Sequence, residues 1–105
     1  MSKIKLVWNS EVRKVKDLLN WKENPRTITK MALEKLKERI KERGFHSVIV
    51  IDKDNTILSG NQRKTALTQL EIKEVNVLVP NRQLTNDERI KIALESNHND
   101  GEWNM

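Results

Sequence analysis

Apolar residues alternate with polar ones in some stretches of the chain and recur every three or four positions in others. A period of two at residues 3–7 and at residues 12–15 predicts two strands. Across residues 32–40 the apolar spacing of three and four predicts an amphipathic helix. Thr29 is its expected N-cap, and Gly44 its expected end, because glycine adopts the left-handed conformation without a Cβ clash.

The second half of the chain continues this alternation of elements. The run VIVI at residues 48–51 predicts a strand buried on both faces, because all four residues are β-branched. The DKDN sequence at residues 52–55 predicts a tight turn, and a returning strand is expected at residues 56–58. A helix at about residues 61–71 and a strand at residues 75–79 are expected to follow.

A third helix is expected after Pro80, which closes the preceding strand. Thr85 and Glu88 have the T-x-x-E spacing of a capping box, whereas residues 96–105 show no clear apolar period. The order β-β-α-β-β-α-β-α predicts one small α+β domain over residues 1–105, with a mixed sheet and about three helices. Its core candidates are Leu36, Ile40, Val48, Val50, Ile57, Leu67, Leu70, Val75 and Val77.

Composition narrows the classes of function. A chain of 105 residues supports one modest core. The absence of cysteine excludes disulfides, thiolate metal sites and thiol catalysis, and the two histidines and scattered aspartates lack a metal-ligand spacing. No apolar run approaches the roughly 20 residues needed to cross a bilayer, and the N-terminus has no apolar core of signal-peptide length. We therefore expect a cytoplasmic protein that does not enter a membrane.

The net charge of +5 is concentrated in the first part of the chain. Residues 1–45 carry 13 Lys and Arg against 6 Asp and Glu, a balance of +7, whereas residues 46–105 carry 7 against 9, a balance of −2. Such an imbalance suits an anionic partner such as DNA. On the first helix, glutamates interleave the basic residues and indicate an ordinary solvated face. The better candidates for DNA phosphate contacts are Lys3, Lys5, Arg13, Lys14 and Lys16.

At Gly60 the hydrophobic period changes from that of a strand to that of a helix. The first turn of a helix has amide N–H groups without partners and a partial positive charge, which together attract anions. Arg63 could grip a phosphate with two parallel hydrogen bonds, and Lys64 adds a second positive charge. Two interpretations remain open: a phosphate site, or a glycine that only permits a sharp turn beside a solvated arginine.

Several motifs in a fixed order resemble the ParB/sulfiredoxin superfamily. They are Asn24-Pro25-Arg26, a helix ending in Gly44-Phe45, and then SVIVI, ILSGNQRKTAL and EIKEVNVLV. The resemblance covers about residues 12–95. The final ESNHNDGEWNM is similar to the segment that follows such domains in phage and prophage proteins, where a ParB-like domain often precedes a DNA methyltransferase. The chain would then be a domain of a longer protein, or a short relative of one.

The resemblance implies where a ligand would bind. Relatives hold a nucleoside triphosphate, CTP or ATP, against the start of the helix, and Mg²⁺ could arrive with its phosphates. The matching positions at the helix start are Gly60, Asn61, Gln62, Arg63 and Lys64. The matching positions across the cleft and in its bordering loop are Asn24, Arg26, Gly44, His46 and Ser47.

Departures from the family pattern bear on catalysis. Sulfiredoxin activity is excluded because it needs a cysteine where Asn61 stands. Partition proteins have a glutamate there that is associated with CTP turnover, and asparagine cannot act as a general base. We therefore expect a non-catalytic module that binds nucleotide, DNA or both.

Two other functions stay open. One is a metal-dependent nuclease or NTPase, for which Asp52 and Asp54 are the only pair of aspartates close together in the sequence. The other is an accessory domain that positions a methyltransferase. A neighbouring methyltransferase domain or a second copy of the chain are the corresponding protein partners.

Overall fold

The computed structural model describes residues 6–21 and 28–102. Its elements in chain order are β1 (Trp8–Lys14), the 3₁₀ turn η1 (Val15–Asp17), α1 (Lys30–Arg43), β2 (Ile49–Ile51), β3 (Ile57–Ser59), α2 (Asn61–Gln69), β4 (Glu74–Pro80) and α3 (Asn86–Glu102). No helix in these two ranges is both long enough and apolar enough to cross a bilayer.

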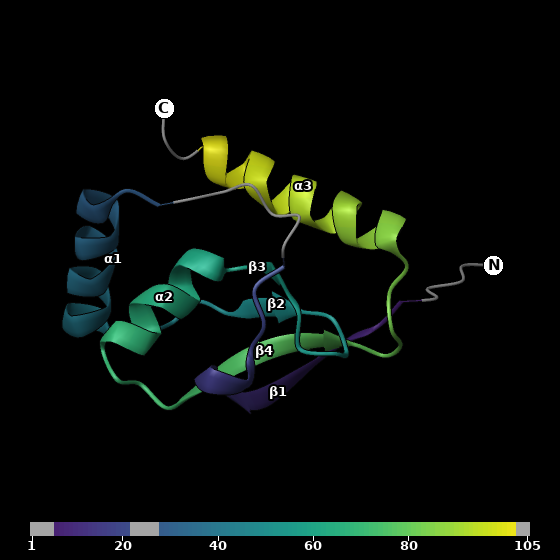
Figure 1. The fold of residues 1–105 in the computed structure, drawn as a ribbon, viewed down its shortest axis with the longest axis horizontal. Coiled ribbons are helices and arrows are strands. Elements are labelled where there is room, and N and C mark those ends of the chain that lie inside the picture. Colours follow the sequence, from purple (N-terminus) through teal and green to yellow (C-terminus); the bar gives the residue numbers. More distant parts are fainter. Residues whose placement is uncertain (1–5, 22–27, 103–105) are drawn as a thin grey trace.

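The strands form one mixed sheet in the order β1-β4-β2-β3. β1 pairs antiparallel with β4, with Lys14 opposite Glu74, while β2 runs parallel to β4 and antiparallel to β3. In Figure 1, α1 stands at one end of the molecule beside α2, and α3 runs along the top past β3. The predicted α+β class, with a mixed sheet and three helices, is confirmed.

The free edge of β3 is partly covered by the chain that follows η1. Leu19 accepts a hydrogen bond from the Ile57 N–H at 2.8 Å and donates its own N–H to the Asn55 carbonyl oxygen at 2.9 Å. Beside it, Leu18 and Trp21 are buried. This segment therefore closes one side of the core before the chain reaches α1.

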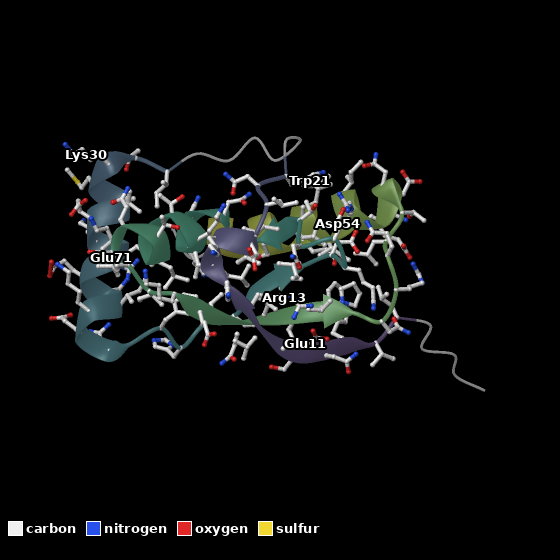
Figure 2. All side chains as sticks on the ribbon, turned by 60° about the horizontal axis from the view of Figure 1, so that its bottom comes forward. Glu11, Arg13, Trp21, Lys30, Asp54 and Glu71 are labelled. Carbon is white, nitrogen blue, oxygen red and sulfur yellow. The ribbon has the colours of Figure 1, made fainter. Side chains whose placement is uncertain are left out.

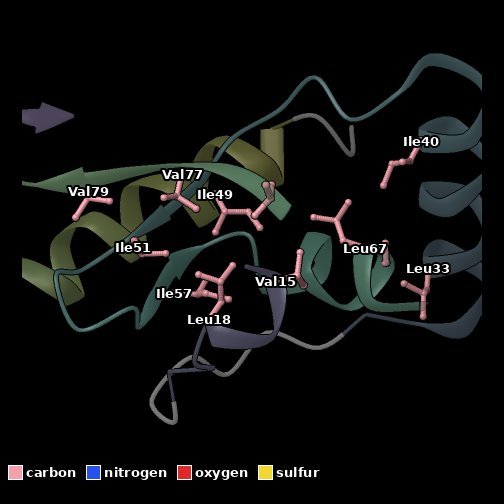
Figure 3. Packing of buried hydrophobic residues seen from close by; sticks show 12 residues of the cluster. Val15, Leu18, Leu33, Ile40, Ile49, Ile51, Ile57, Leu67, Val77 and Val79 are labelled. Atoms are coloured by element: carbon pink, nitrogen blue, oxygen red, sulfur yellow. The ribbon is translucent and has the colours of Figure 1, made fainter. Parts of the chain in front are cut away.

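The core lies between the sheet and the helices and is centred on β2, β3, β4 and α2 (Figure 3). The predicted core residues Ile40, Ile57, Leu67, Val75 and Val77 are buried, and Leu36 and Leu70 are half-buried against the same cluster.

The strand expected at residues 48–51 is buried fully on one face only, and the core candidates Val48 and Val50 were the wrong choice. Ile49 and Ile51 have no exposed surface, whereas Val48 and Val50 are only half-buried. Successive side chains of a strand point to opposite faces. Assigning the core side chains one residue off therefore exchanges the buried residues with the partly solvated ones. Four consecutive β-branched residues contain no alternation that would distinguish the faces.

In the described residues near the N-terminus the structure shows one strand, where parts of two were expected. β1 spans Trp8–Lys14 because its partner β4 offers only seven residues for pairing. Leu6 and Val7 lie outside any strand, and residues 3–5 lie outside the described part of the chain. Val15 turns into the core and begins η1, so the expected strand at residues 12–15 ends early.

The predicted helix ends are confirmed. The Thr29 hydroxyl oxygen accepts a hydrogen bond from the Ala32 N–H at 3.1 Å, and Gly44 ends α1 at a φ of 76°. Thr85 and Glu88 form the reciprocal capping box at 2.9 and 3.2 Å. From this start α3 continues to Glu102, through residues with no apolar period, because each added helical residue gains a backbone hydrogen bond.

The different burial of Ile49 and Val50 in β2 predicts different losses of stability when each is truncated to alanine. Ile49→Ala should lower the free energy of unfolding by about 2–5 kcal/mol because it opens a cavity under α2. Val50→Ala should cost less than about 1.5 kcal/mol because its side chain is partly solvated. Urea unfolding of both variants measures the difference, and a larger loss for Val50→Ala would contradict the assigned faces.

Candidate functional site

Gly60 joins β3 directly to α2 without a connecting loop. Its φ of 114° lies in the left-handed region that side chains disfavour. A Cβ at this position would also lie 3.0 Å from Cγ1 and 3.3 Å from Cγ2 of Ile49. Packing against β2 therefore requires the glycine, and the helix starts pressed against the first residue of that strand.

The first turn of α2 has hydrogen-bond donors to spare. The Lys64 N–H donates to the Gly60 carbonyl oxygen at 2.9 Å, but the N–H groups of residues 61–63 have no acceptor among the described residues. Glycine has no side chain with which to cap them. The buried Oδ1 of Asn61 likewise has no partner within the described part. The helix start thus retains polar groups that a ligand could satisfy.

Positive charge at the same helix start is also uncompensated. Arg63 and Lys64 are half-buried, and neither forms an ion pair or a side-chain hydrogen bond with any residue that the structure describes. A cation in the first turn is unfavourable for the helix itself. Two of them next to free amide groups form an arrangement that favours an anion.

The loop after α1 reaches the same edge of the sheet. It leads into Ile49, which packs against Gly60, so Gly44 to Ser47 precede the residue that borders the helix start. Gly44, His46 and Ser47 are exposed, and no hydrogen bond joins their side chains to α2. The predicted Asn24 and Arg26 lie outside the described residues. The structure therefore links this loop to the helix start only through Ile49, and it does not place Asn24 or Arg26.

A polar network that the sequence did not indicate holds the start of α3. Asp52 is completely buried and accepts hydrogen bonds from Nε of Arg89 at 2.7 Å, the Leu84 N–H at 3.0 Å and Nε2 of Gln83 at 3.1 Å. Arg89 also binds Oδ2 of Asp54 at 2.7 Å through Nη2 (Figure 2 shows where Asp54 lies). The guanidinium therefore stands between the two carboxylates that the nuclease hypothesis required.

A second ion pair supports the capping box. Arg82 binds both carboxylate oxygens of Glu88 at 2.9 and 2.7 Å. The hydrogen bonds from Arg82 and from the Thr85 N–H lower the pKa of Glu88 to about 2. Burial acts to raise the pKa of Asp54, but hydrogen bonds from Thr56 and Arg89 outweigh it and bring this pKa to about 2. In residues 6–21 and 28–95, no three His, Cys, Asp or Glu side chains are grouped to hold a metal ion.

The candidate DNA contacts do not share one surface. Arg13 binds Oε1 of Glu11 at 2.7 Å and Oδ1 of Asn55 at 3.2 Å, so its charge is already engaged (Figure 2). Lys14 follows it on β1 and therefore points to the other face of the sheet. Lys14 and Lys16 are exposed and unpaired among the described residues, whereas Lys3 and Lys5 lie outside them.

Comparison with known protein families identifies the family to which this chain belongs. The family model of the ParB N-terminal domain matches residues 4–98. This chain belongs to the ParB N-terminal domain family. A search of curated proteins finds no match.

Solved structures of ParB domains share the fold. The C-terminally truncated chromosome-partitioning protein ParB from Caulobacter crescentus, complexed with CTP-gamma-S, gives a TM-score of 0.76 at 24% identity over 85% of this chain and 52% of that one. Two structures of Pnob8-like ParB N-domains give TM-scores of 0.70 and 0.68 at 21% and 22% identity. Their matches cover 86% and 88% of this chain, and 36% and 34% of theirs. This ParB N-terminal domain therefore spans about half or less of these chains.

The contact between Gly60 and Ile49 predicts the cost of a side chain at the joint. Gly60→Ala should destabilise the domain by more than the roughly 1–2 kcal/mol of left-handed strain, because its Cβ also meets Ile49. The matched control is the same substitution in an Ile49→Ala background, which removes Cγ1 and Cγ2 of Ile49 but keeps the positive φ of position 60. If Gly60→Ala lowers stability equally in the two backgrounds, as measured by thermal melts, the packing contact is unimportant.

The ion pairs around α3 predict a loss of stability in acid. The carboxyl groups of Asp54 and Glu88 have ordinary pKa values of 3.8 and 4.5, respectively. Both pKa values fall to about 2 in the folded domain. A lowered pKa stabilises the fold above the unfolded value and loses that contribution as pH falls toward the folded value. Urea midpoints should therefore decline between about pH 4.5 and pH 2. Asp54→Asn and Glu88→Gln should each make this decline shallower, and an unchanged slope would contradict the assignment.

Proposed function

We propose that this ParB N-terminal domain binds a nucleoside triphosphate at the start of α2 and does not hydrolyse it. The observation that carries the proposal is that, among the described residues, the N–H groups of residues 61–63 have no acceptor and the charges of Arg63 and Lys64 have no partner. The Caulobacter crescentus relative, described as complexed with CTP-gamma-S, supports the choice of a nucleotide. Within a longer protein, such a domain would serve a partition-type function on DNA.

In this proposal the phosphates lie against the first turn of α2. The amide groups of residues 61–63 donate to phosphate oxygens, and the guanidinium of Arg63 binds one phosphate through two hydrogen bonds. Lys64 adds charge, and Mg²⁺ enters with the nucleotide and is held mostly by its phosphates. The remaining contacts would come from the two flanking segments, at Asn24, Arg26, Gly44, His46 and Ser47.

Asn61 has two parts in the proposed site. Its buried Oδ1 lacks a donor within the described part of the chain, and an unsatisfied buried acceptor costs about 1–3 kcal/mol. A hydroxyl group of the ligand would remove this cost. The amide cannot take a proton from an attacking water, so the site would retain the nucleotide without turning it over.

Titration of the ¹⁵N-labelled domain with CTP, ATP and GTP in the presence of Mg²⁺ tests the site. The amide signals of residues 60–64 should shift and saturate with at least one nucleotide. Arg63→Ala should weaken binding about tenfold or more, because it removes a charge-assisted contact with phosphate. Arg39→Ala, on the exposed face of α1, removes the same charge elsewhere and should bind as the unmodified domain does.

Two results would contradict the proposal in different ways. Unchanged signals at residues 60–64 with all three nucleotides would remove the site. Release of phosphate by the pure domain, lost in Asn61→Ala, would keep the site but replace the non-catalytic function with an NTPase.

A further inference from the structure

An open groove lies at the opposite end of α2 from the proposed nucleotide site. It has a volume of about 520 Å³ and runs between the end of β1 with η1 on one side and residues 68–74 on the other. Lys14 and Lys16 line the first wall and Lys73 lines the second, and we call this depression the lysine groove. Val15 and Ile72 supply apolar surface between the walls.

The three ammonium groups of the lysine groove are not paired with any side chain in the described part of the domain. None of them forms an ion pair or a side-chain hydrogen bond with a residue in the described ranges. Lys14 stands directly opposite Glu74 in the β1–β4 register, yet the two charges do not come within ion-pairing distance. By contrast, the neighbouring Arg13 is fully engaged by Glu11 and Asn55.

The walls of the groove are held at a fixed separation. The Val15 N–H donates to the Lys73 carbonyl oxygen at 2.9 Å, which joins one wall to the other. At the end of α2, the Ile72 N–H returns to the Leu67 carbonyl oxygen at 3.0 Å and fixes the turn into β4. The lysines therefore extend from a preorganised frame, so little backbone conformational freedom would be lost on binding a ligand.

We propose that the lysine groove binds the sugar–phosphate backbone of duplex DNA. Three unpaired ammonium groups around one depression match the spaced negative charges of a phosphate chain. No aromatic side chain lines the groove, so stacked single-stranded bases have no platform there. The contact is independent of the nucleotide site, which lies about 12 Å away at the other end of the nine-residue helix α2.

Two carboxylates on the same groove make the proposal sharply testable. Glu71 and Glu74 reduce the charge of the groove from three positive lysines to a net +1, since 3 − 2 = 1. If a phosphate chain occupies the groove, removing either carboxylate must strengthen binding. Lysines that are merely solvated would show no such response.

Binding of a fluorescent duplex DNA is measured from 50 to 200 mM salt by anisotropy. Lys14→Gln, Lys16→Gln and Lys73→Gln should each weaken binding and lower the log–log salt slope by about 0.9. Glu71→Gln and Glu74→Gln should each strengthen binding roughly two- to fivefold, the size of an exposed charge interaction. Lys30→Gln and Lys35→Gln on α1 are the matched controls and should behave as the unmodified domain does.

Amide shifts locate the contact and separate it from the nucleotide site. Duplex DNA should move the signals of residues 14–17 and 68–74, without requiring a nucleotide. Absence of saturable binding at 50 mM salt, equal effects of the control lysines, or stronger binding of single-stranded than of duplex DNA would each overturn the proposal. A failed nucleotide titration would leave these outcomes unaffected.

Discussion

The packing of Gly60 against Ile49 determines where α2 begins. Each end of this helix borders one of the two proposed binding sites. Because no side chain fits between the joint and β2, the chain passes from strand to helix at the very edge of the sheet. The first turn of α2 is then left uncapped at this edge, beside the loop that leads into β2. Nine residues later, α2 ends beside η1, where it supplies one wall of the lysine groove.

The distribution of charge divides the domain into two parts. Around α3, the arginines are matched to carboxylates: Arg82 to Glu88, and Arg89 to Asp52 and Asp54. At the two ends of α2, Arg63 and the groove lysines have no such partners among the described residues. Paired charges position elements of the fold, while unpaired ones increase the attraction for an external anion. The proposed functions follow this division.

Features encoded by neighbouring residues could be predicted from the sequence. The Thr29 cap, the Thr85–Glu88 box and the change of period at Gly60 each depend on residues within four positions of one another. For the same reason the phosphate-site hypothesis could be framed around residues 60–64. The order of motifs then indicated the family, which the match over residues 4–98 establishes.

Features that depend on distant residues could not be predicted in the same way. Arg89 lies 37 residues from Asp52, and nothing local marks the two as partners. Lys73 joins Lys14 and Lys16 only because β4 pairs with β1 across the sheet. The buried face of residues 48–51 is decided by which side of β2 receives α2, and four β-branched residues carry no information on that choice.

The burial of Asp52 has a consequence for how sequences of this kind can diverge. Its carboxylate has no exposed surface, and Arg89 is the cation that compensates it. Losing either partner alone would leave an uncompensated charge in the interior, whereas replacing both by apolar groups can be tolerated. Positions 52 and 89 are therefore expected to vary together between related chains. Solvated lysines such as Lys35 can instead be substituted independently of other positions.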